Sequence, residues 1–150
     1  MSKNALIGIA GVHYVVSELS RRNMVALPTV KNMAAYDIVA LNIEGTRHAN
    51  IQVKASSNQV QFFPMPPAAK VRAGLRDFYV LVRWIESEHK YEGFLLKGKE
   101  ARREVEDTVR RQQKSISKGS RKKEFPTVHV GHHNATKAKR WSAAWLKWVI

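Results

Sequence analysis

Three polar side chains occur where two paired strands would normally carry apolar residues. The segment YDIVALNIEGTRHANIQVKASS (residues 36–57) has Asp37 before one apolar run and Gln52 and Lys54 within a second. Burying an unpaired carboxylate or ammonium costs several kcal/mol, so such groups find partners or do chemistry. A carboxylate with a neighbouring acceptor can hold a hard cation such as Mg²⁺, and a lysine beside it can stabilise charge on a phosphate. The pattern indicates either a metal-assisted phosphoryl site or a cross-strand Asp37–Lys54 ion pair worth about 0.2–1 kcal/mol.

The geometry of this site depends on how the two strands pair. Because side chains alternate along a strand, Gln52 and Lys54 share one face and the residues between and beside them share the other. If the turn centres between Gly45 and Thr46, Asp37 lies opposite Lys54 on the same face. A slip of one residue would move Asp37 to the other face, so the prediction depends on this register.

The elements expected around the hairpin form a single domain, residues 1–150. Apolar residues recur at helical spacing over residues 5–22, where Ser2 or Asn4 can cap the start and Asn23 can end the helix in a left-handed turn. Apolar runs predict strands at 24–27, 35–43, 49–55, 78–85 and 91–96. We expect a Pro-rich loop with room for one helical turn at 62–76, and a mostly solvated helix at 99–114. A basic loop at 115–136 and a docking helix at 137–150 follow. This order is typical of an α/β protein with a mixed β-sheet flanked by helices.

Positive charge is the strongest compositional signal. The chain has 26 Lys and Arg against 12 Asp and Glu, a net charge of +14, and residues 97–140 carry +9 of it. Such a field favours a polyanion, which in most cases is nucleic acid, although nonspecific binding to RNA or to an acidic protein partner is the alternative. The residues expected to contact nucleic acid are Lys97, Arg102, Arg103, Arg110, Arg111, Lys118, Arg121, Lys122 and Lys123.

Two other features bear on the cellular compartment. The chain has no cysteine, which excludes disulfides and thiolate metal sites and leaves the redox compartment open. Its N-terminal apolar run is too short to span a bilayer and is followed by no small-residue cleavage site. We therefore expect a soluble cytoplasmic protein without membrane contact.

The order of these motifs resembles a known nuclease superfamily. The segments GVHYVVSELSRRNMVALPTVKN, YDIVALNIEG and NIQVKASS follow one another as helix, strand and strand. They resemble the PD-(D/E)XK, or restriction-endonuclease-like, nucleases, and in particular a group of small bacterial proteins with an ELSRR…D…QVK pattern. The likeness spans residues 8–96, with a weaker echo in the Trp-containing tail. It implies a restriction-endonuclease-like core, Mg²⁺ or Mn²⁺ as cofactor, and cleavage of DNA phosphodiester bonds.

The resemblance also implies roles for single residues. Asp37 matches the metal-binding aspartate, and Gln52 stands where many relatives have a second acid. Lys54 matches the catalytic lysine, and the carbonyl of Val53 is a further metal ligand in this superfamily. Glu18 matches the glutamate of ELSRR and would reach the metal through water. The alternative for Glu18 is an ion pair with an arginine one helical turn along the chain.

Two departures from the family pattern concern negative charge. Relatives have a glutamate on the first helix where this chain has Val12, next to His13, and Gln52 is neutral. Fewer carboxylates would then face the cation. The chain is thus either a metal-dependent endonuclease or a catalytically weakened or inactive nucleic-acid-binding module on the same fold.

The C-terminal third contains two further patterns. His129, His132 and His133 suggest a metal site or an incomplete HNH motif, against which a solvated loop is favoured. Three tryptophans near residues 141–148 lie at helical spacing, which favours docking of a helix on the core or on a second copy in a homodimer. Stacking of nucleobases on these rings is the alternative.

Overall fold

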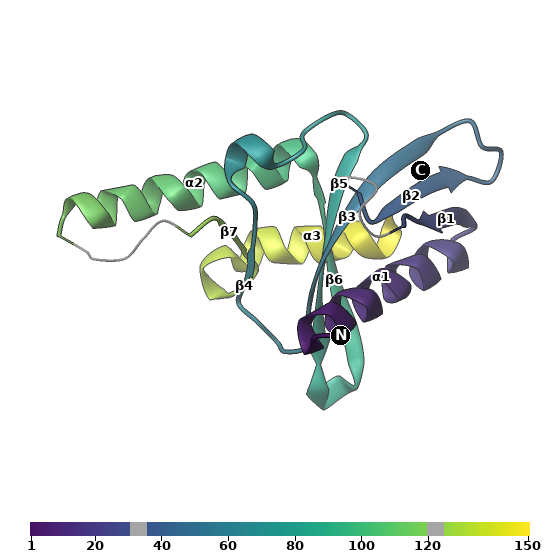
Figure 1. Ribbon diagram of the computed structural model, residues 1–150, viewed down its shortest axis with the longest axis horizontal. Coiled ribbons are helices and arrows are strands. Elements are labelled where there is room, and N and C mark those ends of the chain that lie inside the picture. Colours follow the sequence, from purple (N-terminus) through teal and green to yellow (C-terminus); the bar gives the residue numbers. More distant parts are fainter. Residues whose placement is uncertain (31–35, 120–124) are drawn as a thin grey trace.

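Alternating apolar residues build a five-stranded mixed sheet in the computed structural model, which describes residues 1–30, 36–119 and 125–150 (Figure 1). The strand order is β1-β2-β3-β5-β6, with β3 and β5 parallel and the other pairs antiparallel. The main elements are α1 (Lys3–Arg21), β1 (Met24–Pro28), β2 (Ile38–Asn42), β3 (His48–Ser56), β5 (Asp77–Ile85), β6 (Lys90–Lys97), α2 (Gly98–Ser117) and α3 (Ala135–Lys147). The α/β class and the mixed sheet flanked by helices are confirmed, and the arrangement is compatible with a restriction-endonuclease-like core.

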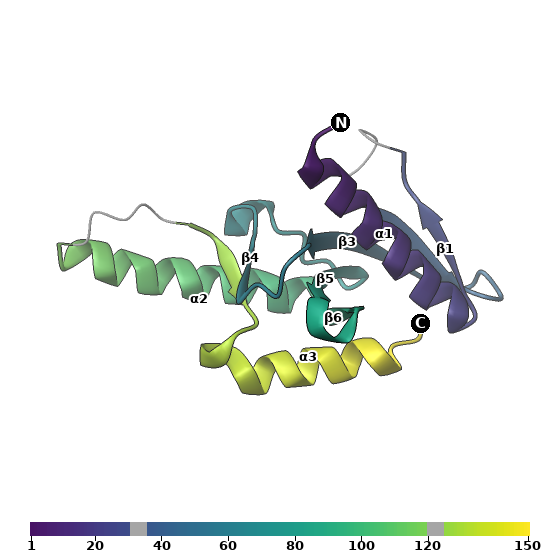
Figure 2. The ribbon, with the colours of Figure 1, turned by 90° about the horizontal axis from the view of Figure 1, so that it is seen from below.

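Helix α1 covers one face of the sheet, over β1 and β3 (Figure 2). The hydroxyl of Ser2 accepts from the backbone N–H of Ala5 at its start, and Asn23 takes a left-handed conformation, φ 60°, just after its end. Gly11 lets the helix approach closely, because a Cβ there would lie 2.5 Å from the Cβ of Ala55 on β3. This contact fixes the N-terminal half of α1 beside the second half of β3.

The other helices cover the rest of the sheet. The first half of α2 packs against the opposite face, while its second half projects beyond the sheet (Figure 1). Helix α3 lies along β6, where Trp141 and Trp145 are each 1% exposed. Trp141 belongs to one of the two apolar clusters of the core, and Trp145 belongs to the other. Gly93 on β6 makes room for the Trp145 ring, since a Cβ there would lie 2.5 Å from Nε1.

Two segments expected to be loops contain a small second sheet. Strand β4 (Phe62–Pro64) pairs antiparallel with β7 (Thr127–His129), so the loop predictions for 62–76 and 115–136 are wrong in these parts. Short helices η1 (Ala68–Lys70) and η3 (His132–Asn134) lie in the same segments, and η2 (Glu86–Glu88) connects β5 to β6. Strands of three residues are too short for alternation to identify, and their partners are far apart in sequence.

The β2–β3 turn sets a register different from the expected one. Asn42 closes the turn: its backbone N–H donates to the carbonyl of Arg47 and its side-chain oxygen accepts from the N–H of Arg47 at 2.7 Å. Gly45 adopts φ 69° within it. Ile38 therefore pairs with Ile51, which places Asp37 opposite Gln52 instead of Lys54. The shift is two residues, so Asp37 still shares a face with both side chains.

Within the described ranges, no helix combines the length and the apolar character needed to cross a membrane.

Candidate active site

Asp37 lies directly before β2 and is held by β3. Its Oδ2 accepts a hydrogen bond from Nε2 of Gln52 at 2.5 Å and another from the backbone N–H of Val53 at 2.7 Å. Its own N–H donates to the carbonyl of Ile51. The backbone pairing of β2 with β3 ends at Ile38 and Ile51. Beyond this pair, the Asp37 carboxylate accepts the hydrogen bond from the Val53 N–H that a further strand residue would otherwise accept.

The second half of β3 borders a cavity. Beyond Ile51, β2 no longer pairs with it, and backbone groups of alternate residues point to one side, so the carbonyl of Val53 faces the same side as the Asp37 carboxylate. The cavity there has a volume of about 480 Å³ and is lined by α1, the end of β1 and the described residues directly before β2. Asp37, Gln52 and Val53 form its polar wall.

Burial dominates the electrostatics of this carboxylate. Half-burial raises the pKa of Asp37 above its ordinary value of 3.8, while the Val53 N–H and the charge of Lys54 act in the opposite direction. Lys54 is half-buried on the same face as Gln52, and its side chain makes no hydrogen bond or ion pair with any residue that the structure describes. Its ammonium is thus near enough to influence Asp37 and is not engaged by a structural partner.

The structure places Glu18 away from this polar wall. Glu18 is not among the described residues that line the cavity, and its Oε2 accepts from Arg21 at 3.1 Å and from Arg22 at 3.0 Å. The contacts of Glu18 are therefore those of the alternative interpretation, an ion pair with arginines one helical turn along the chain. Val12, by contrast, does line the cavity, together with Asp37.

Sequence reasoning missed the apolar side of the cavity. Ala5, Gly8, Ile9 and Val12 line it from α1, and His13 joins them. A spacing of three and four residues places such positions on one helix face, so the signal was present in the sequence. It became recognisable only once the face of α1 opposite Asp37 was known.

The residues present suit an oxygen-preferring cation. Because Gln52 donates through Nε2 and Oδ2 of Asp37 takes both hydrogen bonds, Oδ1 of Asp37 and Oε1 of Gln52 keep free acceptor capacity. Together with the Val53 carbonyl, these two atoms would offer oxygen donors with one carboxylate to Mg²⁺, an ion that keeps several of its waters. Among the described residues, no three His, Cys, Asp or Glu side chains cluster as a metal site.

The basic residues expected to contact nucleic acid are divided by the structure. Arg103 is exposed on α2, and Lys97 and Lys118 are exposed just before and just after this helix. Arg102, in contrast, donates to the carbonyl of Val71 and so anchors the η1 segment. A hollow of about 290 Å³ is lined by Asp107, Arg110, Arg111, Lys114 and Lys137. Arg121, Lys122 and Lys123 lie outside the described residues.

The histidines of the C-terminal third do not lie in a solvated loop throughout. His129 is half-buried on β7, with its ring 5.7 Å from that of Phe62, which corrects the loop interpretation for this residue. Burial, followed by the charges of Arg111 and His133, lowers the pKa of His129. His132 and His133 lie in η3, exposed, with ring centroids 6.1 Å apart.

No protein-family model matches the chain, and no curated protein proves similar to it. Among solved structures, a bacterial homing endonuclease, I-Ssp6803I, is similar in fold with a TM-score of 0.44 and 18% sequence identity, over 65% of this chain and 67% of that one. A likeness at this level does not carry a functional argument, so function is argued below from the residues of this chain.

Proposed function

We propose that this protein is a metal-dependent nuclease that hydrolyses DNA phosphodiester bonds at the cavity beside Asp37. The observation that supports it most is a half-buried carboxylate kept on a cavity wall with one oxygen unbonded, next to an unpaired lysine. Such an arrangement costs folding free energy, and strained or costly groups of this kind concentrate at functional sites.

Each residue has a role in this proposal. Asp37, Gln52 and the Val53 carbonyl hold Mg²⁺ or Mn²⁺, which supplies a Lewis acid that polarises a phosphoryl oxygen and acidifies water. Lys54 orients the attacking water or stabilises the negative charge that grows on the phosphate in the transition state. The exposed lysines and arginines of α2 hold the phosphate backbone by counterion release.

Cleavage of plasmid and short duplex DNA with Mg²⁺ or Mn²⁺ tests the proposal. Mn²⁺ should support faster cleavage, because a site with one carboxylate suits an ion of higher intrinsic ligand affinity. Lys54→Ala should lower the rate by about a hundredfold or more, the usual scale for one transition-state electrostatic contact. Lys70→Ala, an exposed lysine on η1, is the matched control and should cleave as the wild type does.

A nucleic-acid-binding module on the same fold is the second candidate. Val12 in place of an acid at the cavity, and the absence of an acidic cluster among the described residues, favour it. DNA binding without cleavage under either metal, and equal behaviour of wild type and Lys54→Ala, would decide for this candidate.

A further inference from the structure

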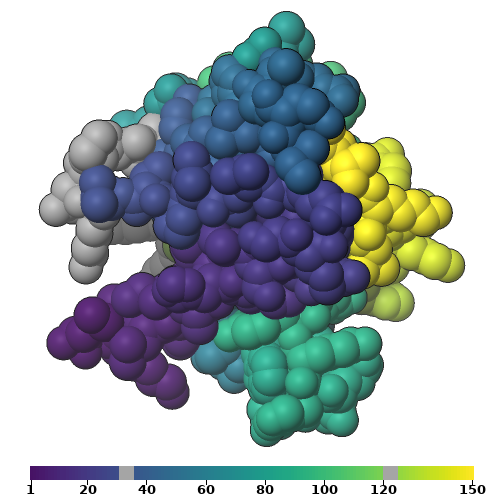
Figure 3. Space-filling model, turned by 90° about the vertical axis from the view of Figure 1, so that its right-hand side faces the viewer, coloured from purple at the N-terminus to yellow at the C-terminus, as the bar shows by residue number. Residues whose placement is uncertain are grey.

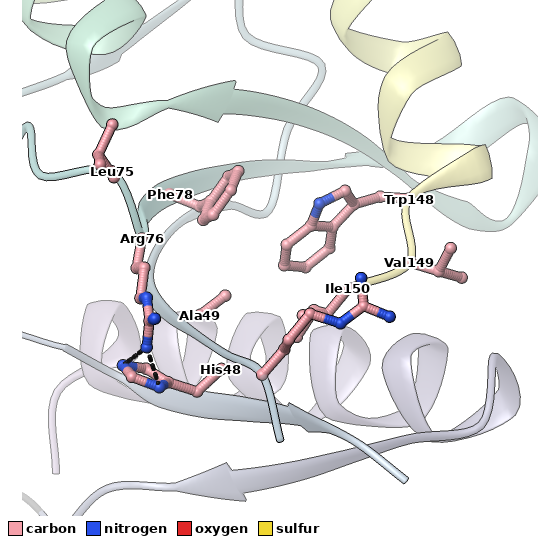
Figure 4. A pocket seen from close by; sticks show the side chains of 9 residues that line it. His48, Ala49, Leu75, Arg76, Phe78, Trp148, Val149 and Ile150 are labelled. Atoms are coloured by element: carbon pink, nitrogen blue, oxygen red, sulfur yellow. Dashed lines mark hydrogen bonds between the residues drawn. The ribbon is translucent and has the colours of Figure 1, made fainter. Parts of the chain in front are cut away.

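A second pocket lies at the other end of β3, against the C-terminal residues (Figure 4). It has a volume of about 310 Å³, at the lower limit for small-molecule sites. Ala49 of β3 belongs to it and Val53 to the Asp37 cavity, and four residues of strand separate them by about 13 Å. The two spaces share none of the described residues in their walls, so the pocket is a separate site.

Aromatic rings form one side of the pocket. Phe78 at the start of β5 and Trp148 just after α3 have ring centroids 4.9 Å apart, inclined by 47°. Both are half-buried, so part of each ring remains accessible. Figure 4 shows the two rings pointing toward the same space, and Figure 3 shows the yellow end of the chain beside the blue β2–β3 hairpin. A flat apolar ligand can stack in such a position.

Basic groups form the other side of the pocket. Arg47, His48 and Arg76 are exposed and line it, and no described carboxylate side chain does. Arg76 donates through Nη1 to His48, with 2.8 Å to Nδ1, which leaves most of its five N–H donors unused. The side chain of Arg47 makes no hydrogen bond or ion pair within the described part of the chain. Two guanidinium groups beside accessible rings are suited to an anion attached to an aromatic ring.

We propose that this pocket binds a nucleotide, with the base against Phe78 and Trp148 and the phosphate on Arg47 and Arg76. A nucleotide combines a flat ring with an anionic phosphate group, which matches the two sides of the pocket. It comes either from a free mononucleotide or from an unpaired nucleotide of a nucleic-acid strand, and both present the same chemistry to the pocket.

Titration of the full-length protein with dAMP, with inorganic phosphate and with a short oligothymidylate tests the proposal. EDTA is present throughout, so the outcome does not depend on the nuclease activity. Binding is followed by calorimetry and by tryptophan fluorescence, and Trp148→Phe assigns the fluorescence change to that ring. We expect saturable binding of dAMP, of the oligonucleotide, or of both, and weaker binding of phosphate alone. Saturation by dAMP identifies free nucleotides as a source, whereas binding of the oligonucleotide alone identifies the strand.

The variant Arg47→Gln/Arg76→Gln should weaken this binding at least tenfold. Both side chains are exposed, so the fold should be retained, which circular dichroism checks. Lys70→Gln/Lys139→Gln removes the same charge from exposed positions outside the pocket and should change binding less than twofold. Equal losses in the two double variants would overturn the proposal. Phosphate binding as tightly as dAMP would also overturn it, because the rings would then contribute nothing.

Discussion

At the scale of single residues, Asp37 combines a place in the proposed site with a cost in stability. Its carboxylate receives two hydrogen bonds, yet burial still raises its pKa. The folded state therefore binds a proton more readily than the unfolded chain does, and the free energy of unfolding falls as pH rises past the ordinary pKa of Asp37. A residue chosen for stability alone would avoid this cost.

We predict that Asp37→Asn stabilises the protein at neutral pH while it abolishes cleavage. Asparagine can place its oxygen where Oδ2 accepts from Gln52 and Val53, so both hydrogen bonds are kept and only the buried charge is lost. The gain in Tm over the wild type should shrink as pH is lowered through the raised pKa of Asp37, because the wild-type carboxyl then becomes neutral as well. Thermal unfolding across this pH range measures it.

The control for this prediction is Asp107→Asn, which removes a charge from the Asp107–Arg110 ion pair at the surface of α2. Such pairs contribute about 0–1 kcal/mol, so its Tm should stay near that of the wild type. A lower Tm for Asp37→Asn at neutral pH would contradict the assignment of a costly buried carboxylate.

Val12→Glu is predicted to strengthen the site by a second carboxylate. Val12 lines the cavity with Asp37, so the new side chain projects into the space where the cation is expected. Mn²⁺ affinity, measured by calorimetry without DNA, and the cleavage rate should each rise about tenfold or more. Val16→Glu, one turn along α1 and not a lining residue, should raise neither. Unchanged Mn²⁺ affinity in Val12→Glu would contradict the metal site.

At the scale of elements, the sequence was sufficient to predict those helices and strands that depend on local residue patterns. The helix over α1, its cap at Ser2 and the five main strands follow from apolar spacing and turn residues. The register of the hairpin did not follow, because it depends on the closure of the turn by Asn42 and not on the strands themselves. The β4–β7 pair depends on tertiary contacts that no local pattern records. The partners of Glu18, by contrast, follow from helical spacing, because Arg21 and Arg22 lie three and four residues further along the chain.

Two glycines of α1 should respond in opposite ways to alanine. A Cβ at Gly8 meets no described atom within 4 Å, whereas one at Gly11 would lie 2.5 Å from Ala55. Gly8→Ala should therefore stabilise the helix by about 0.5–1 kcal/mol, and Gly11→Ala should destabilise the protein by about 1–3 kcal/mol through overpacking. Chemical denaturation measures both.

The same pair of variants tests the cavity. Gly8 lines it, so the added methyl group of Gly8→Ala narrows the space offered to substrate. We expect slower cleavage from a more stable protein, a combination that a purely structural role for Gly8 would not produce. If Gly8→Ala cleaves DNA at the wild-type rate, the substrate does not contact the α1 side of the cavity.

At the scale of the whole molecule, positive charge and the candidate site occupy different elements. The Asp37 cavity lies between α1 and β3, whereas the strongly basic region includes α2, whose second half projects from the sheet (Figure 1). A projecting basic helix can contact phosphates without contributing to chemistry. Binding and cleavage should then be separable by substitution.

Neutralising one exposed cation of α2 and one directly after it should weaken DNA binding without changing the chemistry. Arg103→Gln/Lys118→Gln removes cations that the structure leaves exposed, while Arg102 is kept because it anchors Val71. Removing one cation that neutralises a phosphate should reduce the slope of log K against log salt concentration by about 0.9, so a reduction of about 2 is expected for the pair. The cleavage rate at saturating DNA should stay within about twofold of the wild type, because neither residue lines the Asp37 cavity. Fluorescence anisotropy over a salt series measures the slope, and an unchanged slope would show that the phosphate backbone is held by other parts of the chain.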